Sequence, residues 1–177
     1  MSSATLIWEI VRGLRIVAAP ADAPPFPVDA EAAEEDTFLV LSAEPVLHQP
    51  PDHPLRIIRD AFAAEPVSPG SVVVREGSPL RLLAVVHDLD QDPTWRPEWV
   101  AAALAAVLRQ CDERALRSLA LPLLGSRHGR LGPERFVSLL RDALDAAPPS
   151  SLQRLWLVVP KGTPPAVFAA LEQPPLG

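Results

Sequence analysis

The stretch LRSLALPLLGSRHGRLGPERFVSLL, residues 116–140, decides the fold expected for this chain. Its first part, residues 116–124, is a short apolar run of the kind found in strands that are buried on both faces of a sheet. A helix is predicted to start at Pro133, because proline suits the first helical turn and the following apolar residues recur at helical spacing. The glycine-rich segment between them completes a strand, loop and helix, an order that often forms a phosphate site in α/β proteins.

Strands and helices are predicted to alternate along the rest of the chain. Residues 71–75 and 80–87 form an expected hairpin, and residues 37–42 an expected central strand bounded by acidic residues. Residues 5–11 and 14–18 are expected to form two short strands, or one strand with a bulge at Gly13. A further strand is predicted at 152–159, and helices at 55–64, 98–113 and 164–171. This alternation predicts an α/β fold with a largely parallel sheet covered by helices.

Length and composition fit one folded domain over residues 1–177. The hydrophobic content of 48% predicts a complete hydrophobic core, and the 22 prolines predict stiff loops between the strands and helices. Residues 20–36, rich in proline, alanine and acids, are predicted to be an acidic surface loop within the domain. No membrane segment is expected at the start of the chain, because Glu9, Arg12 and Arg15 interrupt its apolar residues.

Charge and cysteine content exclude several function classes. A net charge of −6 gives no basic face for DNA, RNA or an anionic membrane surface. One cysteine, Cys111, can form neither an intrachain disulfide nor a C-x-x-C site, which favours a reducing, cytoplasmic compartment. Cys111 also lies on the apolar stripe of a predicted helix, so a core position is expected.

The segment 124–132 is the strongest candidate ligand site. Its glycines allow backbone amides to close around an anion, although a Walker sequence and a G-x-G-x-x-G sequence are both absent. A tight turn without ligand is the alternative, in which Arg127 and His128 face solvent instead of supplying charge or a proton-transfer group. The binding residues predicted here are Leu124, Gly125, Ser126, Arg127, His128 and Gly129.

Other candidates lie at the ends of predicted strands. Ser42, Ala43 and Glu44 follow the expected central strand, where Glu44 either binds a ribose hydroxyl or acts with His128 as an acid–base group, or is simply solvated. The segment 87–92 lacks the glycine and glutamate of an EF-hand, so His87 is read as a structural residue, with a transition-metal ligand as the weaker alternative. No metal and no cofactor are predicted. Trp95 and Trp99 either cap the core or stack on a ligand or partner.

Four segments of this sequence resemble the macro domain, a family of ADP-ribose-binding α/β/α modules. Residues 39–44 (LVLSAE) are similar to the family's Ile-Val-Asn-Ala-Ala-Asn strand, and residues 69–74 (PGSVVV) to its Gly-(Glu/Asp)-Ala-Val-x-Thr turn and strand. Residues 83–87 (LAVVH) resemble the Val-Ile-His strand, and residues 118–126 (SLALPLLGS) the strand that leads into the family's phosphate loop. The resemblance implies a three-layer α/β/α domain with a mixed, mostly parallel sheet.

The sequence also departs from the family pattern at the ligand site. Ala18 and Ala19 stand where the family has the Gly-Asp that holds adenine, which leaves Asp22 as the nearest acid, and Glu44 replaces an asparagine. Residues 48–58 contain no glycine where the family has its first phosphate loop. The resemblance therefore implies a divergent, bacterial-type domain with a degenerate site that binds ADP-ribose or a related nucleotide or phosphate ligand through residues 124–132 without catalysis. The alternatives are an ADP-ribosyl or O-acetyl-ADP-ribose hydrolase with a non-standard site, and a protein-interaction module that has lost ligand binding.

Overall fold

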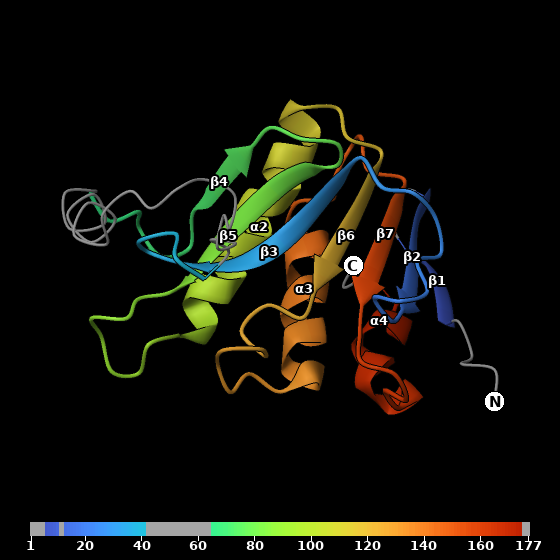
Figure 1. The fold of residues 1–177 in the computed structure, drawn as a ribbon. Helices are drawn as coiled ribbons and strands as arrows, with labels where there is room; N and C mark the ends of the chain where they lie inside the picture. Colours follow the sequence, from blue (N-terminus) through green and yellow to red (C-terminus); the bar gives the residue numbers. More distant parts are fainter. Residues whose placement is uncertain (1–5, 11–12, 42–64, 175–177) are drawn as a thin grey trace.

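A seven-stranded mixed sheet forms the centre of the molecule (Figure 1). The computed structural model describes residues 6–10, 13–41 and 65–174. Strand order across the sheet is β1-β2-β7-β6-β3-β5-β4, with antiparallel pairs β1–β2 and β4–β5 at the two edges and parallel pairing between them. The strands are β1 (Leu6–Ile10), β2 (Leu14–Ala19), β3 (Ala30–Asp36), β4 (Val72–Arg75), β5 (Leu80–His87), β6 (Ser118–Pro122) and β7 (Arg154–Val158).

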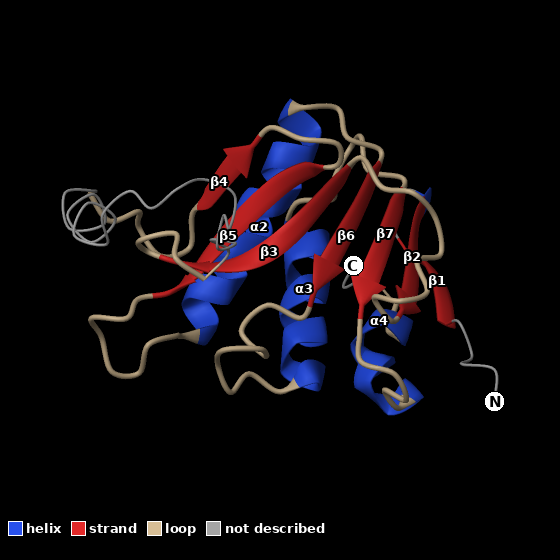
Figure 2. Cartoon of the chain, in the orientation of Figure 1, coloured by secondary structure: helices blue, strands red, loops and turns tan. Residues whose placement is uncertain are grey.

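The described helices lie together on one face of this sheet (Figure 2). They are α2 (Pro97–Glu113), α3 (Pro133–Ala146), the 3-10 turn η2 (Pro165–Phe168) and α4 (Ala169–Glu172). Proline occupies the first turn of both long helices, where its missing N–H leaves no hydrogen bond unmade. Their apolar stripes and the inward side chains of the strands form the main core, in which Cys111 is buried as expected. The helix predicted over residues 55–64 lies outside the described residues.

A smaller apolar cluster lies apart from this main core. Trp156 on β7 contacts Ala19 and Ala120, and the loop before β3 contributes Phe26 and Val28. The Trp156 indole Nε1–H donates to the Ala19 carbonyl at 3.0 Å, which satisfies its one polar atom. This cluster fixes the loop between β2 and β3 against the sheet.

The central strand corrects the sequence prediction. Residues 37–41 form a turn instead of a strand, and β3 lies earlier, at Ala30–Asp36, between β5 and β6. The loop predicted at residues 20–36 therefore covers only 20–29. Small alanines fit the buried positions of a strand paired on both sides, although alanine has low strand propensity by itself.

The acids that end β3 hold the turn that follows it. The Asp36 carboxylate accepts hydrogen bonds from the N–H groups of Phe38, Val40 and Leu41 at 2.7–3.0 Å, and Glu35 accepts from Leu41 at 2.8 Å. Asp36 is fully buried, so these bonds replace the water it has lost. The apolar run after β3 is therefore wound into a turn rather than extended.

The remaining predicted elements within the described residues are confirmed in kind, with ends shifted by a few residues. They are the two N-terminal strands, the hairpin of β4 and β5, helices α2 and α3, strands β6 and β7, and the short helical segment near the C-terminus. The sheet is mixed and mostly parallel, as expected. Within the described ranges, none of the helices is long and apolar enough to cross a membrane.

Candidate functional site

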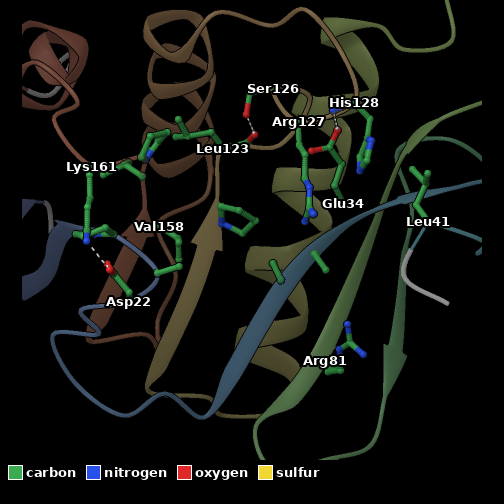
Figure 3. Close-up of a pocket in the computed structure, with 17 residues that line it drawn as sticks. Asp22, Glu34, Leu41, Arg81, Leu123, Ser126, Arg127, His128, Val158 and Lys161 are labelled. Carbon is green, nitrogen blue, oxygen red and sulfur yellow. Dashed lines mark hydrogen bonds and ion pairs between the residues drawn. The ribbon is translucent and has the colours of Figure 1, made fainter. Parts of the chain in front are cut away.

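A cleft of about 920 Å³ opens where the carboxyl ends of four neighbouring strands meet (Figure 3). It is bounded by the loops that follow β2, β3, β6 and β7, and its floor runs along β3 to Arg81 on β5. Ligands of open α/β sheets bind at this edge, because the loops and helix N-termini gather there. The lining residues are Pro20, Ala21, Asp22, Ala32, Ala33, Glu34, Leu41, Arg81, Pro122, Leu123, Ser126, Arg127, His128, Val158, Val159, Pro160 and Lys161.

The loop between β6 and α3 turns sharply at Gly125. This glycine has a φ of +79°, a conformation that L side chains rarely adopt, and its carbonyl accepts the Leu131 N–H at 3.1 Å. The Ser126 hydroxyl and N–H both donate to the Leu123 carbonyl, at 2.5 and 3.2 Å. Among the described residues, the N–H groups of Gly125 and Arg127 have no hydrogen-bond acceptor. Of these two residues, Arg127 lines the cleft, so the loop keeps one backbone donor available there.

Three of the residues predicted to bind ligand in this loop do not line the cleft. Leu124 is fully buried in the main core. Gly125 packs against Val100 and Leu131, and Gly129 lies so close to the Trp95 ring that an added Cβ would stand 2.9 Å from Cγ. Both glycines therefore shape the loop and do not face the cleft. Trp95 also packs against the main core, as one of the two alternatives expected for it.

The other predicted residues divide into two groups. Asp22, Ser126, Arg127 and His128 are brought together in the cleft from two loops that are about 100 positions apart in sequence. Ser42, Ala43 and Glu44 lie outside the described residues.

Glu34 is a cleft residue that the sequence analysis missed. Its side chain is 6% exposed, and its carboxylate Oε1 is hydrogen-bonded to the ring nitrogen Nε2 of His87. The same oxygen accepts the backbone N–H of His128 at 3.4 Å, and the His128 ring meets the His87 ring edge-on with centroids 5.9 Å apart. Glu34 thus connects the end of β3, the end of β5 and the glycine loop.

The misplaced central strand explains why Glu34 was overlooked. With the strand expected at 37–42, Glu44 was the acid at its carboxyl end, whereas the true strand ends in the acidic run Glu34, Glu35 and Asp36. The sequence signal for Glu34 was the run of three acids, residues 34–36, that follows the alanines of β3 and marks the carboxyl end of that strand. His87, read as a structural residue from the sequence, is buried beside Glu34, and the described residues contain no group of three or more His, Cys, Asp or Glu side chains able to hold a metal.

Within the described part of the chain, one lysine and two arginine side chains line the cleft. The Arg127 side chain extends from the glycine loop toward the centre of the cleft, beside Glu34 (Figure 3). Lys161, the only lysine of the chain, pairs with Asp22 at 2.5 Å across the loops that follow β7 and β2. The hydrogen bond from Lys161 lowers the pKa of the Asp22 carboxyl below its ordinary value. Arg81 lies at the other end of the cleft, where its Nε is 3.8 Å from Glu31 Oε1.

Comparison with known proteins identifies the fold. No protein-family model and no curated protein sequence matches the chain. The Oceanobacillus iheyensis macrodomain with ADP bound superposes with a TM-score of 0.63 at 12% identity, over 96% of this chain and 93% of that chain. A mutant of the same macrodomain with ADPR superposes with a TM-score of 0.62 at 12% identity, over 96% of this chain and 95% of that chain. The macrodomain of Thermus aquaticus DarG superposes with a TM-score of 0.59 at 20% identity, over 82% of this chain and 98% of that chain. The chain has the macrodomain fold.

Proposed function

We propose that the protein is a binding module for ADP-ribose or a related nucleotide, held in the cleft with its phosphates on the loop between β6 and α3. The observation that carries the proposal is the position of Arg127, a cleft residue that has both a guanidinium without an ion-pair partner and a backbone N–H without an acceptor among the described residues. A guanidinium and backbone N–H groups are the donors that proteins use most often for phosphate.

The size of the cleft supports a ligand of this class. Small-molecule sites commonly have volumes of about 300–1,000 Å³, and the cleft has about 920 Å³. Apolar wall residues such as Leu41, Val158 and Val159 stand beside the polar groups, which suits a ligand with both a flat base and charged phosphates. Two of the macrodomain structures that share this fold hold ADP or ADPR.

Local donors can bind an anion despite the acidic net charge. The formal charge of −6 is distributed over the whole chain, and salt screens charges beyond about 8–10 Å. Arg127 has no ion-pair partner within 4 Å among the described residues, so its charge is available to a ligand.

Thermal unfolding with and without ADP-ribose tests the proposal. At 100 times its dissociation constant, a ligand that binds only the folded state adds about 2.7 kcal/mol, which raises Tm by roughly 5–10 °C for a chain of this length. ADP, AMP and inorganic phosphate serve as comparisons. An unchanged Tm with all four compounds at millimolar concentration would contradict the proposal.

A matched pair of arginine variants locates the site. Arg127→Gln removes a charge that lines the cleft, whereas Arg130→Gln removes one from an exposed residue of the same loop that does not line it. Loss of a charged hydrogen bond costs about 1.5–3 kcal/mol, so Arg127→Gln should weaken ADP-ribose binding by roughly 10- to 100-fold in titration calorimetry. Equal weakening in both variants would point to a diffuse charge effect instead.

A further inference from the structure

Arg81 lies on β5 at the end of the cleft away from the glycine loop, and one of its hydrogen-bond donors is unsatisfied. Its Nε is buried and has no hydrogen-bond acceptor among the described residues. The Glu31 carboxylate on β3 is 3.8 Å from this nitrogen, which is beyond hydrogen-bond distance. A buried donor without an acceptor is costly, so an anion that enters this end of the cleft would find a donor that the protein itself leaves unused.

A second arginine lies directly across from Arg81. The register of the antiparallel pair β4–β5 sets Arg75 opposite Arg81, so the two side chains share one face of the sheet, where like charges repel. Within the described part of the chain Arg75 forms no ion pair within 4 Å, and the neighbouring Glu76 lies 3.9 Å from Arg114. Glu31, in register with Arg81 on its other side, brings a single carboxylate. This row of three residues therefore carries a net positive charge.

The cleft connects this row to the glycine loop. Glu31 stands three residues before Glu34 on β3, a separation of about 10 Å along the strand. Arg127 lies beside Glu34, and Arg81 lies on the far side of β3 from it (Figure 3). Ala33 lines the cleft between the two ends, and its small side chain leaves the passage open. A ligand held at Arg127 therefore reaches Arg81 only with a second anionic group roughly 10 Å away.

We propose that the Arg81 end of the cleft is a second phosphate site, for a nucleoside diphosphate that carries a further phosphate on the 2′ oxygen of its nucleoside ribose. The diphosphate lies at Arg127, as in the proposed function on which this inference rests, and the 2′-phosphate lies beside Arg81 and Arg75. The two phosphate groups flank one ribose ring, which gives a separation of the required order. Other nucleotide-binding folds also place an arginine against a ribose 2′-phosphate. The planar guanidinium matches phosphate geometry, and a phosphomonoester carries nearly two negative charges at neutral pH.

The second site can be measured as the ratio of two dissociation constants, for ADP-ribose and for ADP-ribose 2′-phosphate. We expect wild-type protein to bind the 2′-phosphate compound roughly tenfold or more tightly in titration calorimetry at neutral pH without divalent cations. Arg81→Gln should reduce this advantage to about twofold or less. Arg109→Gln is the matched control, because it removes the same charge from an exposed residue of α2 that does not line the cleft.

Glu31→Gln should change the ratio in the opposite direction. It removes the carboxylate beside Arg81, so the advantage of the 2′-phosphate compound should rise by roughly threefold to tenfold. Such a gain cannot arise from a variant that has lost its fold.

Two kinds of failure are distinguishable in these titrations. The second phosphate site is wrong, while nucleotide binding stands, if wild-type protein binds both compounds equally. It is also wrong if Arg81→Gln and Arg109→Gln give the same ratio, or if Glu31→Gln lowers the ratio. If wild-type protein binds neither compound, the proposed function itself fails, and this inference with it.

Discussion

At the scale of single residues, two glycines of one loop have opposite tolerance for a side chain. A Cβ on Gly129 would approach the Gly125 carbonyl oxygen and stand 2.9–3.0 Å from the Trp95 ring. A Cβ on Gly132, at the N-cap of α3, would meet only the Glu134 carboxylate oxygen at 3.7 Å, an ordinary contact. Gly129 is therefore required by close packing and Gly132 is not.

Gly129→Ala is expected to destabilise the protein by about 1–3 kcal/mol, because the added Cβ clashes with the Gly125 carbonyl oxygen and with the Trp95 ring, and the loop backbone must shift to make room. Gly132→Ala should cost less than about 1 kcal/mol, the scale of an N-cap change. Urea unfolding at constant m-value measures both, and Gly129→Ala should also weaken nucleotide binding. Equal losses in the two variants would show that the close approach of Gly129 to the Gly125 carbonyl oxygen and the Trp95 ring does not matter.

At the scale of elements, the last turn of α2 is fastened to the segment that leads into β7. The Asp112 carboxylate accepts the N–H groups of Ser150 and Ser151 at 2.8 and 2.9 Å and the Ser151 hydroxyl at 3.0 Å. A carboxylate near a helix C-terminus is disfavoured by the helix dipole. Desolvation raises the pKa of Asp112, but the hydrogen bonds from Ser151 and Ser150 outweigh it, and the net pKa lies below the ordinary value of 3.8.

Asp112→Asn should therefore lower the free energy of unfolding by about 1–2 kcal/mol at neutral pH. Because the folded-state pKa is the lower one, the carboxylate stabilises the fold above the unfolded-state pKa, and this stabilisation is lost as pH falls through the folded-state pKa. The stability difference between wild type and variant should thus shrink toward zero in the acid range below about pH 4. A difference independent of pH, measured by urea unfolding, would contradict this account.

At the scale of the whole molecule, Cys111 reports on global unfolding. It is fully buried between α2 and the sheet, and desolvation raises the pKa of its thiol to about 12. At pH 8 the thiol is therefore protonated in the folded protein and unreactive, whereas an unfolded cysteine has a pKa near 8.5 and reacts readily.

A thiol reagent at pH 8 should label native protein at least about a thousandfold more slowly than urea-unfolded protein, because labelling requires the core to open. ADP-ribose at 100 times its dissociation constant should slow native labelling by a further factor of about 100 when opening and closing are fast. Rapid labelling of native protein would show that the region around Cys111 opens locally.

The order of elements followed from the sequence because it depends on local properties. The apolar runs of β5, β6 and β7, the helical spacing after Pro97 and Pro133, and the turn between β4 and β5 are each contained in a short window, and the structure confirms them. The same local signals placed Arg127 and His128 on a loop at a strand end, where they line the cleft.

The position of the central strand and the contacts of Glu34 were decided only by tertiary structure. Residues 37–42 are more apolar than residues 30–36, but pairing with β5 and β6 favours the alanines of β3, while Asp36 holds the next residues in a turn. Glu34 meets His87 and the His128 N–H from positions 53 and 94 residues away, so no sequence window contains the contact. Apart from the central strand, the sequence by itself determined where the described strands and helices lie and which glycine-rich loop joins β6 to α3, because periodicity and turn chemistry are local. The tertiary structure alone decided which acid of the central strand lines the cleft, since that depends on strand register between segments far apart in the chain.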